Sequence, residues 1–290
     1  MHTRAEAIST GSCEHISLVD LHDGFCRAFS DYSVAMQPSI SEFRLMLAQR
    51  GFDATLSWAA LAGRSVVSFW LIGHDPTSCN RSAYVIASGT VPDFRGRGLA
   101  EDLHRRLQQS FVRYGINSVQ LEVITSNKPA RSLYAKLGYV SVRDLCCFEV
   151  ARTAIRIASV GQADIAECAV SDVLALAPIF RDWQPSWQNG IRSLSRIHGE
   201  LVCIAARING DPVAYGVLIK PANTIAQLAV RDDRRRCGIG SAVLHALATA
   251  SPRHVLKIIN ADSRDTGFQA FLTHHGAQTG ITQLEMVVRL

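Results

Sequence analysis

A basic, glycine-rich segment occurs twice in this chain of 290 residues, at corresponding places in its two halves. It reads RGRGLA at residues 95–100 and RRCGIG at residues 235–240. Each copy follows an apolar run and opens a helical stripe of apolar residues. The free N–H groups and the macrodipole at a helix N-terminus bind phosphate. The repeat therefore predicts two similar domains, each with a phosphate-binding turn.

The order of the predicted elements is also repeated. The first half begins with two helical patterns, at 18–29 and 40–49, and continues with three strands, at 55–61, 66–72 and 83–90. A helix then begins at residue 99. A strand at 118–124, a short helix at 130–137 and a last strand at 139–150 complete this half. The second half begins with a helical pattern at 163–180, which is followed by three strands at 201–208, 213–219 and 224–230 and by a helix that begins at residue 239. It ends, like the first half, with a strand at 254–260, a helix at 268–272 and a strand at 283–290. We therefore expect domains at 1–150 and 151–290.

Composition limits the class of protein. Hydrophobic residues make up 48% and charged residues 19% of the chain, which is typical of a globular protein. The first 14 residues lack the apolar region of a signal peptide, and no apolar run reaches the roughly 18 residues of a membrane span. The eight cysteines form no zinc-like spacing. These features predict a cytoplasmic protein without a metal and without a membrane partner.

The net charge of +5 comes largely from scattered arginines, which are dense only at 231–236. A nucleic-acid site would add aromatic side chains between the basic ones, and none is present there. The Gly-x-Gly that follows favours a phosphate cradle instead. We therefore expect no nucleic-acid partner.

Each residue type in the first turn suits a pyrophosphate. Gly96 and Gly98 let the backbone approach a phosphate closely, and Arg95 and Arg97 add positive charge. The dinucleotide fingerprint needs a third glycine where Glu101 stands, and the Gly-Lys-Ser/Thr of a Walker loop is absent. The turn thus predicts a phosphorylated cofactor of another kind.

Longer segments around the turn indicate which class of phosphorylated cofactor it binds. Residues 91–100 (VPDFRGRGLA) and 121–127 (LEVITSN), followed by LGY at 137–139, resemble the two cofactor motifs of the GNAT superfamily of acyl-CoA-dependent N-acyltransferases. Residues 228–240 repeat the first motif well, whereas the second motif is poor in the second half. The chain resembles a tandem protein of this family. The resemblance implies an α/β (α+β) fold with two domains, each a mixed, splayed β-sheet flanked by helices.

The resemblance also implies acetyl-CoA as cosubstrate, bound where the fourth and fifth strands splay. The residues expected to contact it are Thr90, Val91, Arg95, Gly96, Arg97, Gly98, Leu99, Ala100 and Asn127 in the first half, and Arg235, Arg236, Gly238 and Gly240 in the second. The backbone of 89–91 is expected to pair with the pantetheine arm and to donate to the oxyanion. For Asn127 a helix N-cap alone is the alternative interpretation.

Acylation of an amine needs a base for the amine proton and an acid for the departing thiolate. Tyr134 stands where family members place the acid. Glu122, in the middle of the strand 118–124, points opposite to its apolar neighbours and resembles the base of related acetyltransferases. A rim tyrosine and a solvent-facing glutamate are the alternatives.

The acceptor is expected to contact the first helices and the fourth strand. The predicted residues are Phe29, Asp31, Tyr32 and Tyr84, with Ser88 also able to face the cleft. Packing or ordinary surface is the alternative for all of them. The acceptor is predicted to be a small-molecule or peptide amine, and the oligomeric state is not readable from the sequence.

The second half lacks both proton-transfer groups. Counting back from Gly276 places Leu272 where Tyr134 stands and Asn260 where Glu122 stands. We therefore predict that the first domain is an N-acetyltransferase and that the second supports it or binds CoA without turnover. A non-catalytic acyl-CoA sensor, catalysis by the C-terminal domain, and transfer to a thiol or hydroxyl are the alternatives.

Overall fold

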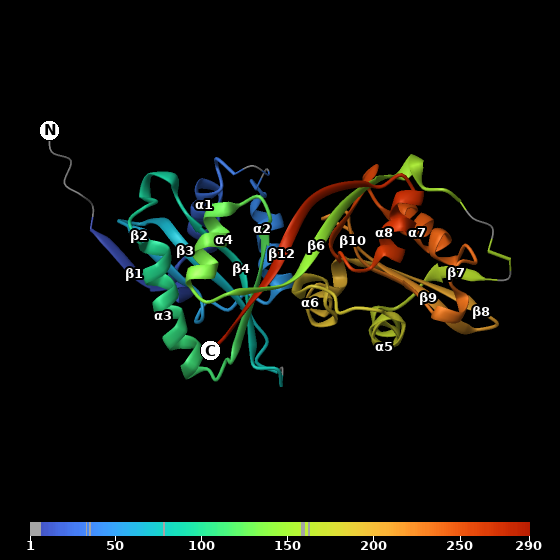
Figure 1. Ribbon diagram of the computed structural model, residues 1–290, viewed down its shortest axis with the longest axis horizontal. Helices are drawn as coiled ribbons and strands as arrows, with labels where there is room; N and C mark the ends of the chain where they lie inside the picture. The colour runs from blue at the N-terminus through green and yellow to red at the C-terminus, as the bar shows by residue number, and fades with distance from the viewer. Residues whose placement is uncertain (1–6, 33, 35, 78, 158–159, 162) are drawn as a thin grey trace. The chain divides into compact units, whose positions relative to one another are not determined.

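The computed structural model describes residues 7–32, 34, 36–77, 79–157, 160–161 and 163–290. The chain forms two compact units (Figure 1). Unit 1 comprises Met1–Val142 with Glu285–Leu290, and unit 2 comprises Arg143–Leu284. The division thus differs from the expected boundary near residue 151, because the chain enters unit 2 within a strand and returns to unit 1 at its end.

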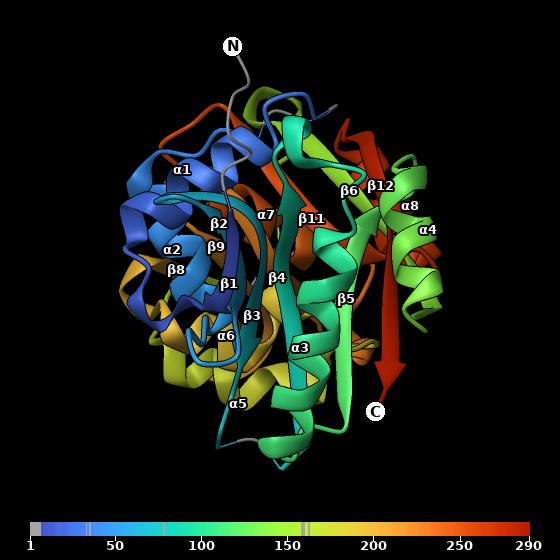
Figure 2. The ribbon, with the colours of Figure 1, turned by 90° about the vertical axis from the view of Figure 1, so that its left-hand side faces the viewer.

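The last strand of each sequence half lies largely or partly in the unit formed by the other half. Strand β6 (Val140–Ala151) pairs with β11 (Val255–Asp262) in unit 2, from Leu145 opposite Asp262 to Ala151 opposite Val255. Strand β12 (Gln278–Arg289) follows β5 (Ser118–Ile124) in strand order, and the two lie side by side in Figure 2. Neither half of the sequence therefore supplies a complete sheet.

The sheet of unit 1 is mixed. Its strands are β1 (Ile8–Ser12), β2 (Trp58–Ala62), β3 (Ser65–His74), β4 (Ser82–Thr90), β5 and the end of β12, in that spatial order. Its helices are α1 (Leu18–Ala28), α2 (Ile40–Arg50), α3 (Leu99–Arg113) and α4 (Lys128–Lys136). The first four strands pair antiparallel, and β4 pairs with β5 in parallel.

Local sequence explains where these helices begin and end. The side chain of Ser39 and Glu42 form a capping box at the start of α2, and Gly51 ends that helix at φ 74°. In α3 the stripe Leu103, Leu107 and Phe111 is fully buried. Helices α1, α2 and α3 all pack on β3, which is why that strand is apolar along nearly its whole length.

Strands β4 and β5 separate at the place where a site is expected. Among the described residues their parallel pairing runs from Ser82 opposite Ser118 to Tyr84 opposite Gln120. Strand β4 continues to Thr90 and β5 to Ile124 beyond that point. The segments 85–90 and 121–124 therefore leave backbone groups and side chains for other partners.

Unit 2 repeats this plan. Its strands follow the order β6, β11, β10 (Thr224–Val230), β9 (Asp211–Ile219), β8 (Leu201–Ile208) and β7 (Asp164–Glu167). Its helices are α5 (Val170–Phe180), α6 (Ile191–Arg196), α7 (Ile239–Ala250) and α8 (Thr266–His274). The parallel pairing of β10 with β11 covers Thr224 opposite Lys257 and Ile225 opposite Ile258.

The predicted fold class is confirmed, with corrections to single elements. The helical pattern predicted over 163–180 is wrong at its start, because Asp164–Glu167 pairs antiparallel with β8 and the helix begins only at Val170. Strand β1 and helix α6 were not predicted, since both are too short for a clear period. Over the described part of the chain, the helices fall short of the length and apolarity that a membrane crossing requires.

Candidate active site

The first turn holds two glycines in the left-handed region. A 3-10 turn, Pro92–Phe94, precedes Arg95, and then Gly96 and Gly98 adopt φ 73° and 75°, with Gly98 as the N-cap of α3. A Cβ built on Gly96 or Gly98 would meet no atom within 4 Å. The space in front of the helix N-terminus is therefore open, which fits a pyrophosphate held by backbone N–H groups.

The side chains of the first turn mostly bond to protein. Arg97 donates to the Asp93 carbonyl at 2.9 Å and lies over the Phe94 ring. The carbonyl of Ala100, one residue after Leu99, accepts from the Trp70 indole at 3.0 Å. These contacts fix the turn on α3 and β3 before any ligand arrives.

Arg95 has more contacts than its neighbours. Its Nε donates to the Thr90 carbonyl and its Nη2 to the Ala28 carbonyl, both at 3.0 Å. Its two terminal nitrogens also donate to the two carboxylate oxygens of Asp31, at 2.7 and 2.8 Å. This pairing lowers the pKa of Asp31 and raises that of Arg95. Asp31, which the sequence predicts to contact the acceptor, is thus bound to the arginine of the first turn.

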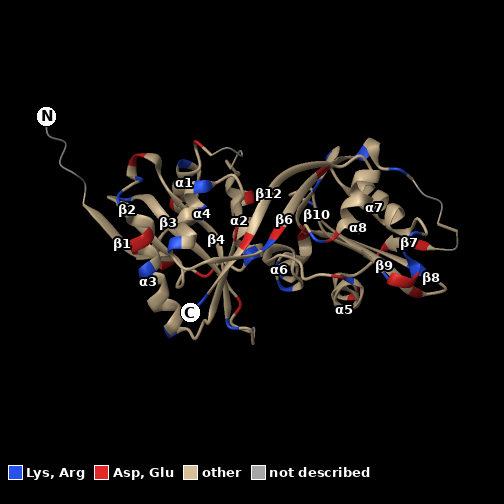
Figure 3. Ribbon diagram, in the orientation of Figure 1, with Lys and Arg blue, Asp and Glu red and all other residues tan. Residues whose placement is uncertain are grey.

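The second turn has nearly the same backbone. Arg236 takes φ 61° where Gly96 takes 73°, and Gly238 takes 81° at the N-cap of α7. A Cβ on Gly240 would lie 3.4 Å from the Val230 and Phe271 side chains, which is ordinary van der Waals contact, and Ala100 stands at the matching position of the first turn. Ion pairs of Arg231, Arg234 and Arg235 with aspartates offset the positive charge nearby, and Figure 3 shows acidic and basic residues interspersed in both units.

The strand before the first turn is partly engaged with β3. The Thr90 hydroxyl bonds that of Ser68 at 2.8 Å, and the Val91 N–H donates to the Val67 carbonyl at 2.9 Å. The N–H of Val91 is thus directed away from β5. Gly89 lies opposite Phe69 on β3, and its carbonyl accepts from the Ser68 hydroxyl at 3.2 Å. Of the three residues predicted to contact the acyl arm through their backbone, Thr90 is therefore the one whose N–H alternates toward the β5 side.

Tyr134 lies on α4 with only 7% of its surface exposed. Its phenol oxygen is 2.9 Å from the Ser88 hydroxyl on β4, and its ring packs edge-on against Trp70. Burial raises the pKa of the phenol, while the hydrogen bond with Ser88 lowers it. The phenol is therefore protonated at neutral pH, as a proton donor must be. The sequence suggested that Ser88 faces this region, but gave no sign of its bond with Tyr134.

Glu122 is half-buried on β5 and accepts a hydrogen bond from the Tyr84 phenol. Tyr84 is buried on β4, and burial, followed by the nearby charge of Glu122, raises the pKa of its phenol well above the ordinary value. Tyr84 therefore stays a donor and orients the carboxylate. The pairs Ser88–Tyr134 and Tyr84–Glu122 share one strand, β4, at and beyond the point where its pairing with β5 ends.

The remaining predicted residues form a loop after α1. Phe29 packs against Phe25 and Tyr32, with ring centroids 4.7 and 5.3 Å apart. The Tyr32 phenol accepts from the Asn127 amide at 3.0 Å, and the Asn127 oxygen accepts from the Ala130 N–H at 3.1 Å. Asn127 is thus the N-cap of α4, and it also binds this loop. Of the predicted acceptor residues, Tyr84 contacts Glu122, whereas Asp31 and Tyr32 contact cofactor-side residues.

In unit 2 the corresponding positions carry no proton-transfer pair. Leu228 stands seven residues before Arg235, as Ser88 does before Arg95, and Leu272 is buried. Asn260 adopts φ 62° in an irregular stretch of β11, and its side-chain oxygen accepts from Gln283 at 2.7 Å.

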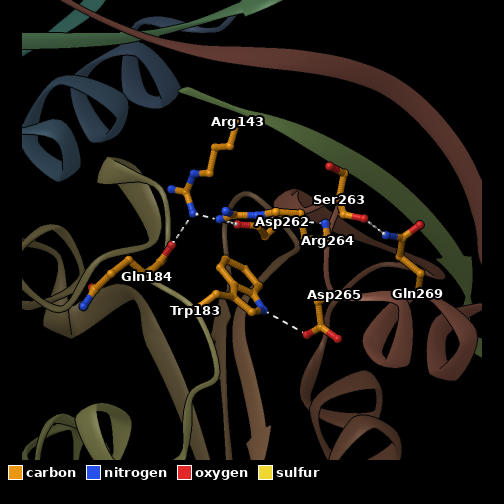
Figure 4. A network of polar contacts seen from close by, with 8 residues as sticks. All are labelled: Arg143, Trp183, Gln184, Asp262, Ser263, Arg264, Asp265 and Gln269. Carbon is orange, nitrogen blue, oxygen red and sulfur yellow. Dashed lines mark hydrogen bonds and ion pairs between the residues drawn. The ribbon is translucent and has the colours of Figure 1, made fainter. Parts of the chain in front are cut away.

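His275 and Asp262 are titratable residues close in sequence to Leu272 and Asn260, and both are bound within unit 2. His275 is buried, accepting from the Arg156 N–H and bonding Ser241. Asp262 is ion-paired with Arg264 at 2.6 Å and Arg143 at 3.3 Å (Figure 4), which lowers its pKa. Neither group is suited to accept a proton from a substrate.

The fold and the two turns define a tandem protein with one cofactor-type turn in each unit. The model of the acetyltransferase (GNAT) family matches residues 19–139 and 173–276. The chain belongs to the GNAT acetyltransferase family, as its motifs predicted.

Similar proteins agree with this assignment. A mycothiol acetyltransferase from Brachybacterium faecium is 31% identical over 121 residues, a match that covers 41% of this chain and 37% of that protein. A tandem GNAT protein from the clavulanic acid biosynthesis pathway superposes with a TM-score of 0.75 at 11% identity, covering 98% of both chains. A GCN5-related N-acetyltransferase from Sphaerobacter thermophilus gives 0.72 at 16% identity, covering 97% of this chain and 95% of that one. These two structures support the fold alone.

Proposed function

We propose that unit 1 transfers an acetyl group from acetyl-CoA to a primary amine of a small molecule or peptide. The observation that supports this most is the presence of two separate hydrogen-bonded pairs, Ser88–Tyr134 and Tyr84–Glu122, on the strand that leads into the cofactor turn. One pair ends in a protonated phenol and the other in a carboxylate. An amide-forming transfer needs both groups.

The residues of unit 1 divide the reaction between them. The helix N-terminus at Gly96 and Gly98 holds the pyrophosphate. Glu122 takes the proton that the acceptor amine loses as its nitrogen forms a bond to the acetyl carbon. As the bond from that carbon to sulfur breaks, Tyr134 donates its proton to the thiolate, and the Ser88 hydroxyl stabilises the phenolate. Glu122 then releases its proton to solvent, and the Tyr134 phenolate takes up a proton from solvent, so both residues return to their starting states. Acetylated amine and free CoA are the products.

Unit 2 is proposed to keep the turn as a structural or CoA-binding element without turnover. Its turn backbone repeats that of unit 1, but leucines stand at the positions of both Ser88 and Tyr134. An apolar side chain cannot donate a proton to a thiolate. The name of the Brachybacterium faecium relative supports acetyl transfer as the activity of the chain.

Titration with acetyl-CoA, followed by thiol release with a panel of primary amines, tests the proposal. We expect Tyr134→Phe and Glu122→Gln each to lower kcat by about 10²-fold or more. Tyr114→Phe is the matched control, because Tyr114 is 51% exposed at the end of α3. If both variants keep the parental kcat while a disrupted 235–240 turn abolishes activity, unit 2 is the catalyst. Binding without release for every amine would favour a sensor.

A further inference from the structure

Both units tie the loop after their first helix to the cofactor-type turn through an arginine and an aspartate. In unit 1, Arg95 grips Asp31 with two hydrogen bonds and also bonds the Ala28 carbonyl. In unit 2, Arg235 donates to Asp182 at 2.9 Å and, like Arg95, donates from Nε to the carbonyl five residues before it, that of Val230. The same contact thus occurs twice, between the same elements of each unit.

The residue after each aspartate makes a second contact, to the N-cap of a later helix. In unit 1, the Asn127 amide donates to the Tyr32 phenol at 3.0 Å. In unit 2, the Trp183 indole donates to the Asp265 carboxylate at 2.9 Å (Figure 4). Asn127 and Asp265 each also cap their helix, α4 and α8.

The chemistry of this second contact changes on both sides at once. An asparagine amide can donate, and its partner is a phenol oxygen that accepts. A carboxylate cannot donate, and its partner is an indole N–H that can only donate. The contact therefore persists although neither residue is the same, which indicates that the contact itself has a role in both units.

We propose that residues 28–32 of unit 1, which are the last residue of α1 and the loop after it, become more ordered when a ligand binds at the turn, with Arg95 as the positioning residue. The loop lies between the turn and α4, the helix that carries Tyr134. It therefore contacts both the turn and the N-cap of the helix that carries the proposed proton donor, and this inference rests on the proposed function of unit 1.

The sign of the coupling follows from the exposure of the ion pair. Arg95 and Asp31 are 46% and 52% exposed, so the ion pair alone contributes little to holding the loop in water. The Arg95 side chain loses conformational entropy when it holds the loop. A ligand that already fixes the backbone of the turn reduces this entropic cost, so the ordered loop becomes more stable. Occupancy of the turn therefore orders the loop, and the effect is largest when the Arg95–Asp31 pair is intact.

Hydrogen exchange with and without saturating acetyl-CoA tests the coupling, because it needs no acceptor. In the parent protein we expect amides of the turn and of residues 28–32 to exchange more slowly with acetyl-CoA, the loop by about fivefold. In Asp31→Asn the turn stays protected and the added protection of the loop is lost. Tyr32→Phe, which removes the phenol oxygen, reduces the loop protection. Asp182→Asn, the corresponding change in unit 2, leaves it unchanged.

Any result that differs from these expectations overturns the inference. Which amides lose protection shows whether the coupling alone fails or the proposed function fails as well. A protected turn with an unprotected loop in the parent protein overturns the coupling alone. Equal loop protection in Asp31→Asn and the parent protein does the same, as does loss of loop protection in Asp182→Asn. If acetyl-CoA protects no turn amide in unit 1, the proposed function fails as well.

Discussion

The two units share a backbone plan but differ in what fills the space beside the turn. In unit 1, Trp70, Ser88, His104 and Tyr134 form a polar and aromatic cluster. The corresponding positions in unit 2, found from the strand pairing and by counting from each turn and its following glycine, are Gly216, Leu228, Leu244 and Leu272.

In unit 2 the space beside the turn is filled by apolar side chains from α7 and α8. A Cβ on Gly216 would lie 2.6 Å from the Leu247 side chain and 2.9 Å from that of Val243, so α7 occupies the space that an indole fills in unit 1. Leu244 and Leu272 are fully buried in the same core. The comparison shows that unit 2 repeats the turn but surrounds it with a different, apolar set of side chains.

The most severe test makes unit 1 resemble unit 2. Replacing both Ser88 and Tyr134 with leucine removes the proposed proton donor and its partner, and we expect kcat to fall by about 10³-fold. Ser88→Ala alone leaves the phenol and lowers kcat by about tenfold. Steady-state thiol release measures both. Full activity in the double variant would show that the proton donor lies elsewhere.

The pH dependence of stability also differs between the units at this cluster. His104 is 1% exposed and its Nε2 has no hydrogen-bond partner among the described residues. Burial lowers its pKa from 6.5 to about 4. Above pH 6.5 the imidazole is neutral in both the folded and the unfolded chain. Between pH 6.5 and 4 only the unfolded chain gains the proton, so about 3 kcal/mol of stability is lost as the pH falls.

His104→Leu, which introduces the residue of unit 2, is expected to remove that loss. Urea unfolding at pH 7.5, 6 and 5 measures it. His198→Leu is the control, because His198 is exposed on the surface of unit 2. The expectation fails if His104→Leu and the parent protein lose stability in parallel on acidification.

Glycine at the N-cap of each turn offers a matched pair of variants. Gly98 and Gly238 adopt φ 75° and 81°, where a side chain introduces strain. We expect Gly98→Ala and Gly238→Ala each to destabilise the protein by about 1 kcal/mol. Acetyl-CoA titration then distinguishes the turns. If Gly98→Ala weakens binding and Gly238→Ala does not, only unit 1 holds the cofactor; if each removes one site, both units do.

The smallest effect is expected from Asn127→Asp, which introduces the N-cap of unit 2. Aspartate caps a helix as well as asparagine, and the Tyr32 phenol can turn to donate to the new carboxylate. The unfolding free energy should therefore change by less than about 0.5 kcal/mol, whereas Asn127→Ala should lose about 1 kcal/mol with the cap. A large loss in Asn127→Asp would mean that the direction of the donor matters.

The sequence predicted most elements of both units because their patterns are local. The strand at 118–124 and the apolar stripe of α3 are read from residues a few positions apart. The strand Asp164–Glu167 was mistaken for helix, since four residues carry little periodicity and only pairing with β8 makes them a strand. Tyr134 and Glu122 were chosen from motif position, while their partners Ser88 and Tyr84 lie 46 and 38 residues away along the chain.

The sequence by itself determined the duplication, the two turns and the different residue types that the second half carries at the positions of Glu122 and Tyr134, because each depends on short stretches of the chain. Only the tertiary structure decided that each half completes its sheet with a strand from the other. It also decided that Arg95 and Asp31 bind each other. Both results depend on contacts between residues far apart in the chain, which no local pattern records.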